Sequence, residues 1–268
     1  MKLPTVGAVT LLTMAVSLAG GNEISQRTVP GDLALTDYRG AKFSLAELVK
    51  DKKGVILAFV GTDCPLVKSY SPRLVALRDR FLPLGVDLIG VDPNVQDSLE
   101  EIAHYAKEFN LSFPILKDLD QKLADATGAT RTPEVVLLDA SLQVRYVGRI
   151  DDQFGVGTRK PAPVREDLIV AVQELLGSKP ISIAKTSSLG CLIGRNKKPT
   201  QDGEVTYHGD IATILQKRCV ECHRSGEIGP MELTKYEDAV AWSDMLVEVV
   251  DTGRMPPWFA DPKVGKFL

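Results

Sequence analysis

The sequence lacks a basic stripe, a polybasic run and an apolar stretch long enough to span a membrane. Acidic and basic residues are interspersed and the formal net charge is only −3, so we expect no nucleic-acid partner and no anionic membrane surface as a partner. The apolar stretch from Val6 to Ala19 is shorter than the roughly 20 residues of a membrane-spanning helix. Histidine is scarce too, with three residues, which gives little support to a copper-delivering module.

What is present is the composition of a globular chain behind an export signal. A hydrophobic fraction of 44% with 25% charged residues is ordinary for a soluble protein, and 268 residues suffice for two modest domains. Lys2, the apolar stretch and the small residues Gly20 and Gly21 have the layout of a secretory signal. We predict a signal peptide at residues 1–20 and a periplasmic or otherwise extracytoplasmic protein with no membrane span after cleavage. The alternative is a buried N-terminal helix.

Alternating strands and helices predict an α/β domain over residues 24–178. The apolar run 55–60 is expected to be a buried central strand. The other expected strands are 33–38, 41–45, 86–91, 113–116, 134–138 and 143–147, and the expected helices are 46–50, one from Pro65 past Leu82, 98–109, 121–126 and 164–176. Residues 179–206 show little periodicity and are interpreted as a linker or strap. A second unit then covers residues 207–268.

The second unit contains CVECH, in which Cys219 and Cys222 are followed directly by His223. Two thiols at this spacing each add to one vinyl group of haem, and the adjacent histidine is placed to bind the iron. We therefore predict covalently attached haem c. A zinc site would need two further ligands, a local disulfide is another alternative, and a redox CxxC would normally open a helix after a buried strand.

Downstream of CVECH the sequence resembles class I cytochrome c domains. Gly229-Pro230 is followed by an expected helix at 236–250 and then by GRMPPW, which contains Met255. The resemblance implies a small all-α electron-transfer domain with Met255 as the second axial ligand, and Met231 or His208 are the alternatives. Such domains close with a further helix that this chain, ending soon after Met255, does not contain. The haem domain is expected to be incomplete.

Cys64 stands where the expected strand 55–60 passes into a helix beginning at Pro65. A thiolate at a helix N-terminus is stabilised by the helix dipole, and Lys68 one turn later adds to this, whereas Asp63 opposes it. In the oxidising compartment expected here, such a cysteine is a candidate for thiol chemistry.

This strand, the cysteine at a helix start and the later Thr132-Pro133 resemble the thioredoxin fold, particularly the redoxin group of alkyl hydroperoxide reductases and thiol-specific antioxidant proteins. The resemblance implies that Pro133 follows a cis bond and faces Cys64. Thioredoxin has its second cysteine where this chain has Val67, which excludes exchange within a CxxC. Peroxiredoxins have a proline and a threonine where this chain has Leu57 and Gly61, so peroxidase activity is only suggested.

Two further residues have alternative interpretations. Arg131 is the nearest cation to Pro133 in sequence and is expected on the surface, with pairing to a thiolate or peroxide as the alternative. Cys191, in the strap, is a candidate resolving or disulfide partner for Cys64. Its alternatives are a static structural disulfide and a buried free thiol.

The whole arrangement resembles bacterial proteins in which a redoxin domain is fused to a c-type cytochrome domain. This implies an extracytoplasmic redox protein that combines thiol or peroxide chemistry at Cys64 with electron transfer through haem. The alternative is a pure c-type electron carrier whose thioredoxin-like domain serves docking or structure. The expected partners are a redox protein that donates or accepts electrons and a peroxide or disulfide substrate.

Overall fold

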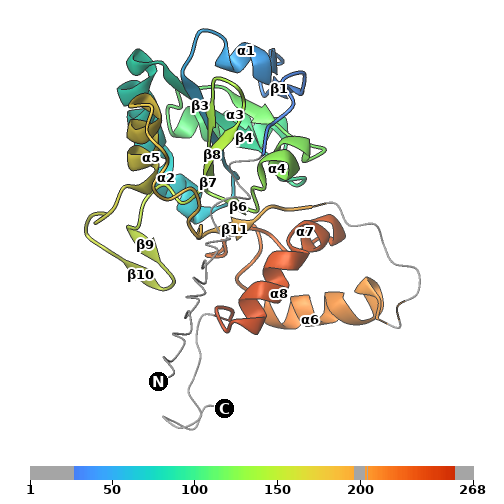
Figure 1. The fold of residues 1–268 in the computed structure, drawn as a ribbon. Helices are drawn as coiled ribbons and strands as arrows, with labels where there is room; N and C mark the ends of the chain where they lie inside the picture. Colours follow the sequence, from blue (N-terminus) through green and yellow to red (C-terminus); the bar gives the residue numbers. More distant parts are fainter. Residues whose placement is uncertain (1–26, 196–202, 204, 257–268) are drawn as a thin grey trace, which may run out of the picture.

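The computed structural model describes residues 27–195, 203 and 205–256. The predicted signal peptide at residues 1–20 and the end of the GRMPPW segment lie outside the described residues. The chain forms an α/β domain with a smaller helical unit beside it, and the strap runs between the two (Figure 1).

The described residues of the α/β domain build a seven-stranded mixed sheet with the order β2-β1-β5-β4-β3-β7-β8. Its strands are β1 (Ala34–Asp37), β2 (Lys42–Ser44), β3 (Gly54–Phe59), β4 (Val86–Asp92), β5 (Ile115–Lys117), β7 (Glu134–Asp139) and β8 (Val144–Gly148). Strand β3 is buried along its whole length and pairs in parallel with β4 and antiparallel with β7. The sequence prediction of a buried central strand at residues 55–60 is therefore confirmed.

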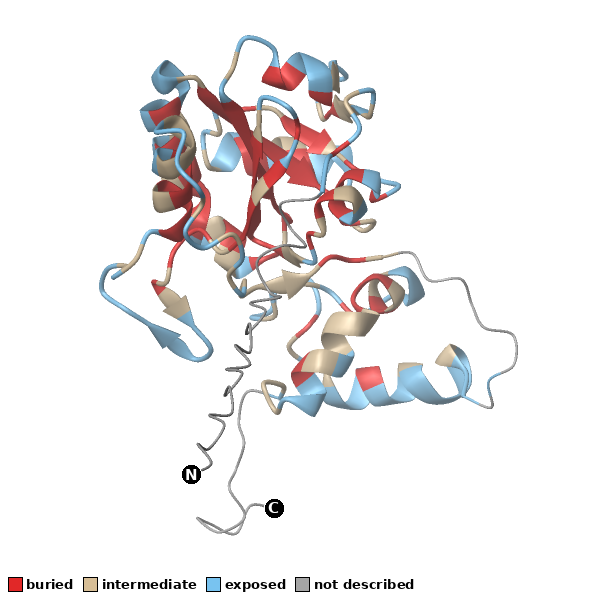
Figure 2. Ribbon diagram, viewed as in Figure 1, coloured by how far each residue is buried: buried red, intermediate tan, exposed pale blue. Residues whose placement is uncertain are grey.

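Helices cover both faces of this sheet. They are α1 (Leu45–Val49), α2 (Pro65–Phe81), the short 3₁₀ helix η1 (Leu82–Leu84), α3 (Leu99–Glu108), α4 (Lys122–Thr127) and α5 (Asp167–Leu176). Helices α2, α3 and α5 contribute to one apolar cluster, and α1 and α4 contribute to a second. Figure 2 shows the buried sheet between them. The cysteine at the start of α2 is thus held between a buried strand and a packed helix.

Helix α5 begins three residues later than the sequence predicted. The Asp152 carboxylate accepts hydrogen bonds from the backbone N–H groups of Val164 and Arg165 at 2.7 and 3.0 Å. These bonds hold the preceding segment in a loop. Between β8 and α5 the chain also forms a hairpin that the sequence did not predict, made of β9 (Phe154–Gly155) and β10 (Thr158–Arg159).

The helical unit consists of the π-helix η2 (Tyr207–Ile211), α6 (Ala212–Arg218), α7 (Tyr236–Ala241) and α8 (Ser243–Asp251). The single helix predicted at 236–250 is wrong, because the chain divides at Trp242. That side chain is buried with Leu215, Leu233 and Ala239 in a cluster of its own, and the Ser243 hydroxyl donates to the Val240 carbonyl at 2.8 Å. Among the described helices, none is long and apolar enough to cross a bilayer.

The segment predicted as a linker or strap is extended along the α/β domain. Its backbone bonds to Val147 of β8 through Ala184 and Thr186. It includes β11 (Cys191–Leu192), which pairs antiparallel with β6 (Arg131–Thr132) so that Cys191 stands opposite Thr132. The strap thereby carries Cys191 to the loop before Pro133.

Candidate active site at Cys64 and Cys191

Cys64 is the N-cap residue of α2, and Pro65 occupies the first turn of that helix. The Cys64 side chain is buried, and its sulfur lies 3.1 Å from the Thr132 carbonyl oxygen. The Thr132–Pro133 peptide bond is cis. The structure therefore brings Cys64 and the loop containing Pro133 together as the resemblance implied.

Cys191 completes this site, because its thiol is hydrogen-bonded to the sulfur of Cys64. This bond, with backbone N–H groups of Val67 and Leu66 at the start of α2, lowers the pKa of Cys64 to about 6 against the opposing effect of burial. The same bond and burial raise the pKa of Cys191. All four cysteines carry free thiols. The opposite directions of the two pKa shifts favour Cys64 as the thiolate and Cys191 as the thiol that donates to it.

Carboxylates lie next to the cysteine pair. Burial and the neighbouring Asp97 raise the pKa of Asp63 to about 6, while Lys68 lowers it. The Asp97 carboxylate itself accepts from the Thr62 backbone N–H at 2.9 Å and from the Asn94 amide at 3.1 Å. Lys68 therefore acts on the carboxylate of Asp63, and the stabilisation of the Cys64 thiolate comes from Cys191 and the helix start.

Leu57 and Gly61, the two positions that differ from the peroxiredoxin pattern, both lie in closely packed surroundings. Leu57 is fully buried in β3. At Gly61, an added Cβ would lie 2.5 Å from the Asn94 amide nitrogen, so a threonine there would displace the Asn94 side chain from its hydrogen bond with Asp97. The geometry supports thiol exchange at Cys64 more than peroxide reduction.

Arg131, expected at the surface, is partly exposed and is also held by contacts that the sequence did not predict. Its guanidinium donates to the Gly190 carbonyl at 3.0 Å and to the Glu248 carboxylate at 2.5 Å. Glu248 belongs to α8 of the helical unit. Arg131 thus joins the α/β domain, the strap and the helical unit at one point, which the sequence could not reveal because the three segments are far apart along the chain.

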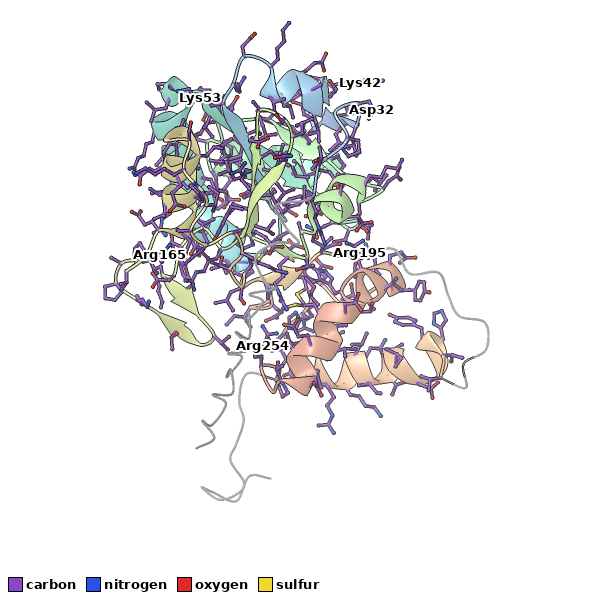
Figure 3. All side chains as sticks on the ribbon, viewed as in Figure 1. Asp32, Lys42, Lys53, Arg165, Arg195 and Arg254 are labelled. Carbon is purple, nitrogen blue, oxygen red and sulfur yellow. The ribbon has the colours of Figure 1, made fainter. Side chains whose placement is uncertain are left out.

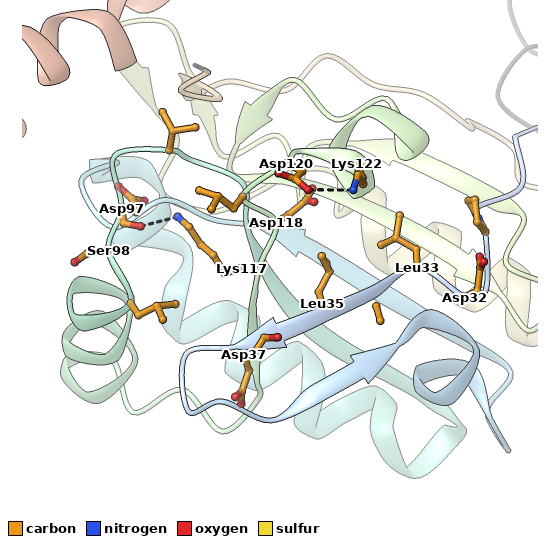
Figure 4. Close-up of a pocket in the computed structure, with 16 residues that line it drawn as sticks. Asp32, Leu33, Leu35, Asp37, Asp97, Ser98, Lys117, Asp118, Asp120 and Lys122 are labelled. Carbon is orange, nitrogen blue, oxygen red and sulfur yellow. Dashed lines mark hydrogen bonds and ion pairs between the residues drawn. The ribbon is translucent and has the colours of Figure 1, made fainter. Parts of the chain in front are cut away.

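Two cavities border this region. The larger, about 850 Å³, opens between β1, the loop after β4 and the start of α4, and its lining includes Asp97, Lys117 and Asp118 but neither cysteine (Figure 4). The smaller, about 260 Å³, is lined by Leu66, Tyr70, Pro133, Arg149, Ile150, Asp151, Phe154, Gly155, Ser187 and Leu189. Since Leu66 and Leu189 each stand two residues from one of the cysteines, the smaller cavity adjoins the thiol site.

The CVECH segment lies in the helical unit, where Cys219 caps the C-terminus of α6. The Nδ1 atom of the buried His223 bonds the Met231 carbonyl at 3.1 Å, which leaves Nε2 as the ring nitrogen available to a metal. An added Cβ on Gly229 would lie 2.7 Å from that Nδ1 atom, so the loop is shaped around the imidazole. Two free thiols for attachment to the vinyl groups and an oriented imidazole for the iron are the residue types that haem c requires.

Met255 stands in the turn after α8, where its backbone N–H donates to the Val249 carbonyl at 2.9 Å. Its side chain is not among those that pack on the Trp242 cluster, whereas Met231 is. Within residues 27–195, 203 and 205–256, no group of three or more His, Cys, Asp or Glu side chains is placed to hold a metal ion.

The charged side chains labelled in Figure 3 lie around the periphery, and Arg254 follows α8, where it pairs with Glu248.

Comparison with known proteins identifies the larger unit. A model described as the AhpC/TSA family matches residues 26–147. The larger unit is an AhpC/TSA redoxin domain with a thioredoxin-like fold. The match ends before CVECH, so haem attachment stays a prediction.

Curated relatives of the redoxin domain are thiol–disulfide oxidoreductases. ResA of Bacillus subtilis (strain 168) is 29% identical over 121 residues, which is 45% of this chain and 65% of ResA. ResA of Halalkalibacterium halodurans is 31% identical over 108 residues, which is 40% of this chain and 59% of that protein. The chain therefore covers less than two thirds of the length of each of these relatives.

Two solved structures are similar over a larger share of the chain. An uncharacterized conserved protein from Geobacillus kaustophilus has a TM-score of 0.57 and 30% identity, covering 66% of this chain and 93% of that one. A hypothetical protein from Sinorhizobium meliloti 1021 has a TM-score of 0.54 and 28% identity, covering 62% and 93%.

Proposed function

We propose that this protein is an extracytoplasmic thiol–disulfide oxidoreductase in which Cys64 is the attacking thiolate and Cys191 the resolving thiol. The observation that carries this proposal is the placement of both cysteines at the Thr132–Pro133 loop, where the Cys64 sulfur contacts the Thr132 carbonyl and Cys191 pairs with Thr132 across β6 and β11. A low pKa keeps Cys64 ionised at neutral pH, and the thiolate is the form that attacks a disulfide. The curated relatives named thiol–disulfide oxidoreductases support this reaction class.

The proposed exchange has two steps. The Cys64 thiolate attacks one sulfur of a substrate disulfide, forming a mixed disulfide and releasing the other sulfur as a thiolate. Cys191, after losing its proton, attacks the Cys64 sulfur, which forms the Cys64–Cys191 disulfide and releases the second substrate thiolate. The substrate disulfide is reduced by two electrons and the cysteine pair is oxidised. A dithiol partner protein restores the pair by the reverse exchange.

Access to Cys64 requires the strap to move. Cys64 is 1% exposed, and the side chain of the strap residue Cys191 interacts with its sulfur. A substrate sulfur can reach Cys64 only after residues 190–192 shift away from β6. The smaller cavity beside Pro133 adjoins this opening. Its lining is mostly apolar, although it also contains Arg149 and Asp151, and it suits an apolar side chain next to the substrate cysteine.

As a second part of the proposal, the helical unit carries haem c held by Cys219, Cys222 and His223, with Met255 as the second axial ligand. Bound haem would supply single-electron transfer to a redox partner. The orientation of His223 supports haem binding. Exposed apolar side chains of the helical unit support it too, because an apolar cofactor would cover such surface. These side chains are Ile211, Ile214, Ile228, Tyr236, Val247 and Val250. Haem c attachment also agrees with the predicted export signal.

The thiol proposal is tested by trapping the cysteines of the full-length protein after equilibration in glutathione buffers. Mass spectrometry is expected to find a Cys64–Cys191 disulfide under oxidising conditions, and Cys64→Ser is expected to abolish reduction of a peptide disulfide. The matched control, Cys219→Ser with Cys222→Ser, should retain that reduction. A wild-type protein that leaves Cys64 and Cys191 as thiols at every glutathione ratio would favour the pure electron carrier.

A further inference from the structure

Helix α8 of the helical unit holds both neighbours of Cys191. On one side, the Leu192 backbone N–H donates to the Met245 sulfur at 3.4 Å. On the other side, the Gly190 carbonyl accepts from Arg131, whose guanidinium is paired with Glu248. Cys191 itself packs against both the main core of the redoxin domain and the Trp242 cluster. The resolving thiol is therefore placed from two directions by one helix.

Arg131 is well anchored for this role. Its backbone N–H and that of Thr130 donate to one oxygen of the Glu134 carboxylate, and the strap residue Ser188 donates to the other at 2.9 Å. The Arg131 side chain is 24% exposed and the Glu248 side chain equally so, and Arg254 adds a second cation to Glu248. A bidentate arginine–carboxylate pair fixes direction as well as distance. Glu248 therefore orients the Arg131 guanidinium that donates to the Gly190 carbonyl.

The approach of the strap at this point is close. Gly190 has φ of +131°, and an added Cβ would lie 2.1 Å from the Thr132 carbonyl oxygen. The strap therefore lies directly on the loop that holds Cys64. A small outward movement of Gly190 would separate the two sulfurs, because Cys191 is the next residue.

We propose that Arg131 is a positioning residue for the thiol pair, oriented by Glu248, so that the helical unit sets how readily Cys64 and Cys191 form their disulfide. The inference rests on the proposed thiol function. Closure of the disulfide depends on how closely the second thiol is held to the first. Loosening the Gly190 contact lowers the effective concentration of the Cys191 thiol at Cys64. The intrinsic reactivity of each sulfur stays the same.

The test is the equilibrium constant for Cys64–Cys191 disulfide formation against glutathione, measured in the full-length protein. Glu248→Gln removes the charge that orients Arg131 and is expected to lower this constant about tenfold, which makes the reduction potential about 30 mV less negative. Arg131→Lys keeps a cation without the planar fork and should produce a similar shift. Asp251→Asn, an exposed charge on the same helix, is the matched control and should leave the constant unchanged.

Three outcomes separate the explanations. A shifted constant in Glu248→Gln and Arg131→Lys, with Glu248→Asp closer to wild type, supports the positioning role. A lower thermal midpoint with an unchanged constant in both variants overturns it, because Glu248 would then serve stability alone. If the wild-type pair forms no disulfide at any glutathione ratio, the proposed function fails first, and the positioning role fails with it.

Discussion

Removing the Cys191 thiol is expected to raise the pKa of Cys64. The hydrogen bond from Cys191 is the largest cause of the shift from 9.0 to about 6. With a pKa of about 6, roughly 90% of Cys64 is thiolate at pH 7, and with a pKa of about 9 the fraction falls to roughly 1%. The Cys191→Ala variant should therefore lose most of its thiolate at neutral pH, while Cys191→Ser, which retains a hydroxyl donor, should lie between the two.

A single rate measurement would hide most of this change. The thiolate population falls about 90-fold, but a thiolate with a pKa about three units higher is roughly 20-fold more nucleophilic at a Brønsted slope near 0.45. The net loss of rate at pH 7 is then only about fourfold, and removal of a covering side chain would offset part of it. The assay must follow the alkylation rate of Cys64 across pH 4 to 10 and locate its midpoint.

The expected midpoints lie near pH 6 for the wild type and well above 8 for Cys191→Ala. Cys219→Ser with Cys222→Ser removes the other thiols and keeps the signal specific to Cys64. A Cys191→Ala midpoint that stays near 6 would refute the reasoning, because the helix start and its backbone N–H groups would then suffice to stabilise the thiolate.

Two further predictions concern Asp63 and the haem site. The pKa of Asp63 is raised from 3.8 to about 6 in the folded chain, so the folded chain favours the protonated carboxyl. The resulting contribution to the free energy of unfolding is fully present below pH 3.8 and is lost as pH rises through 6. Asp63→Asn should therefore raise the thermal midpoint at pH 7 relative to wild type with little change at pH 4, and an equal shift at both pH values would contradict this. In protein produced with haem-attachment machinery, Met255→Ala should lose the methionine-to-iron charge-transfer absorption while the reduced α band persists, with Met231→Ala as the matched comparison; loss of that absorption in Met231→Ala alone would reassign the ligand.

Local patterns predicted much of the fold and part of the site. The buried strand β3, the helix after Pro65 and the junction at Cys64 follow from a short apolar run and a proline, which act within a few residues. The later start of α5 and the break at Trp242 were not predicted, because they depend on a distant carboxylate and on burial in a separate cluster. Helical periodicity does not report such contacts.

The contacts around Cys191 join segments that are distant in the sequence, so the sequence could not predict them. The residue type and its place in a strap made it a candidate, but its position opposite Thr132 depends on the pairing of β6 with β11. Arg131 was expected on the surface for the same reason, since its partners Gly190 and Glu248 belong to segments much later in the chain. Only the tertiary structure makes these residues neighbours.

The position of the strap also has a consequence for biosynthesis. In a CxxC protein both thiols emerge together, whereas here the whole sheet and α5 precede Cys191 in the chain. Domains generally fold from the N-terminus as they are made. During export, Cys64 would thus spend an interval as a lone thiol beside an unpaired β6, and the newly made domain would acquire its second thiol only when the part of the strap that contains Cys191 arrives.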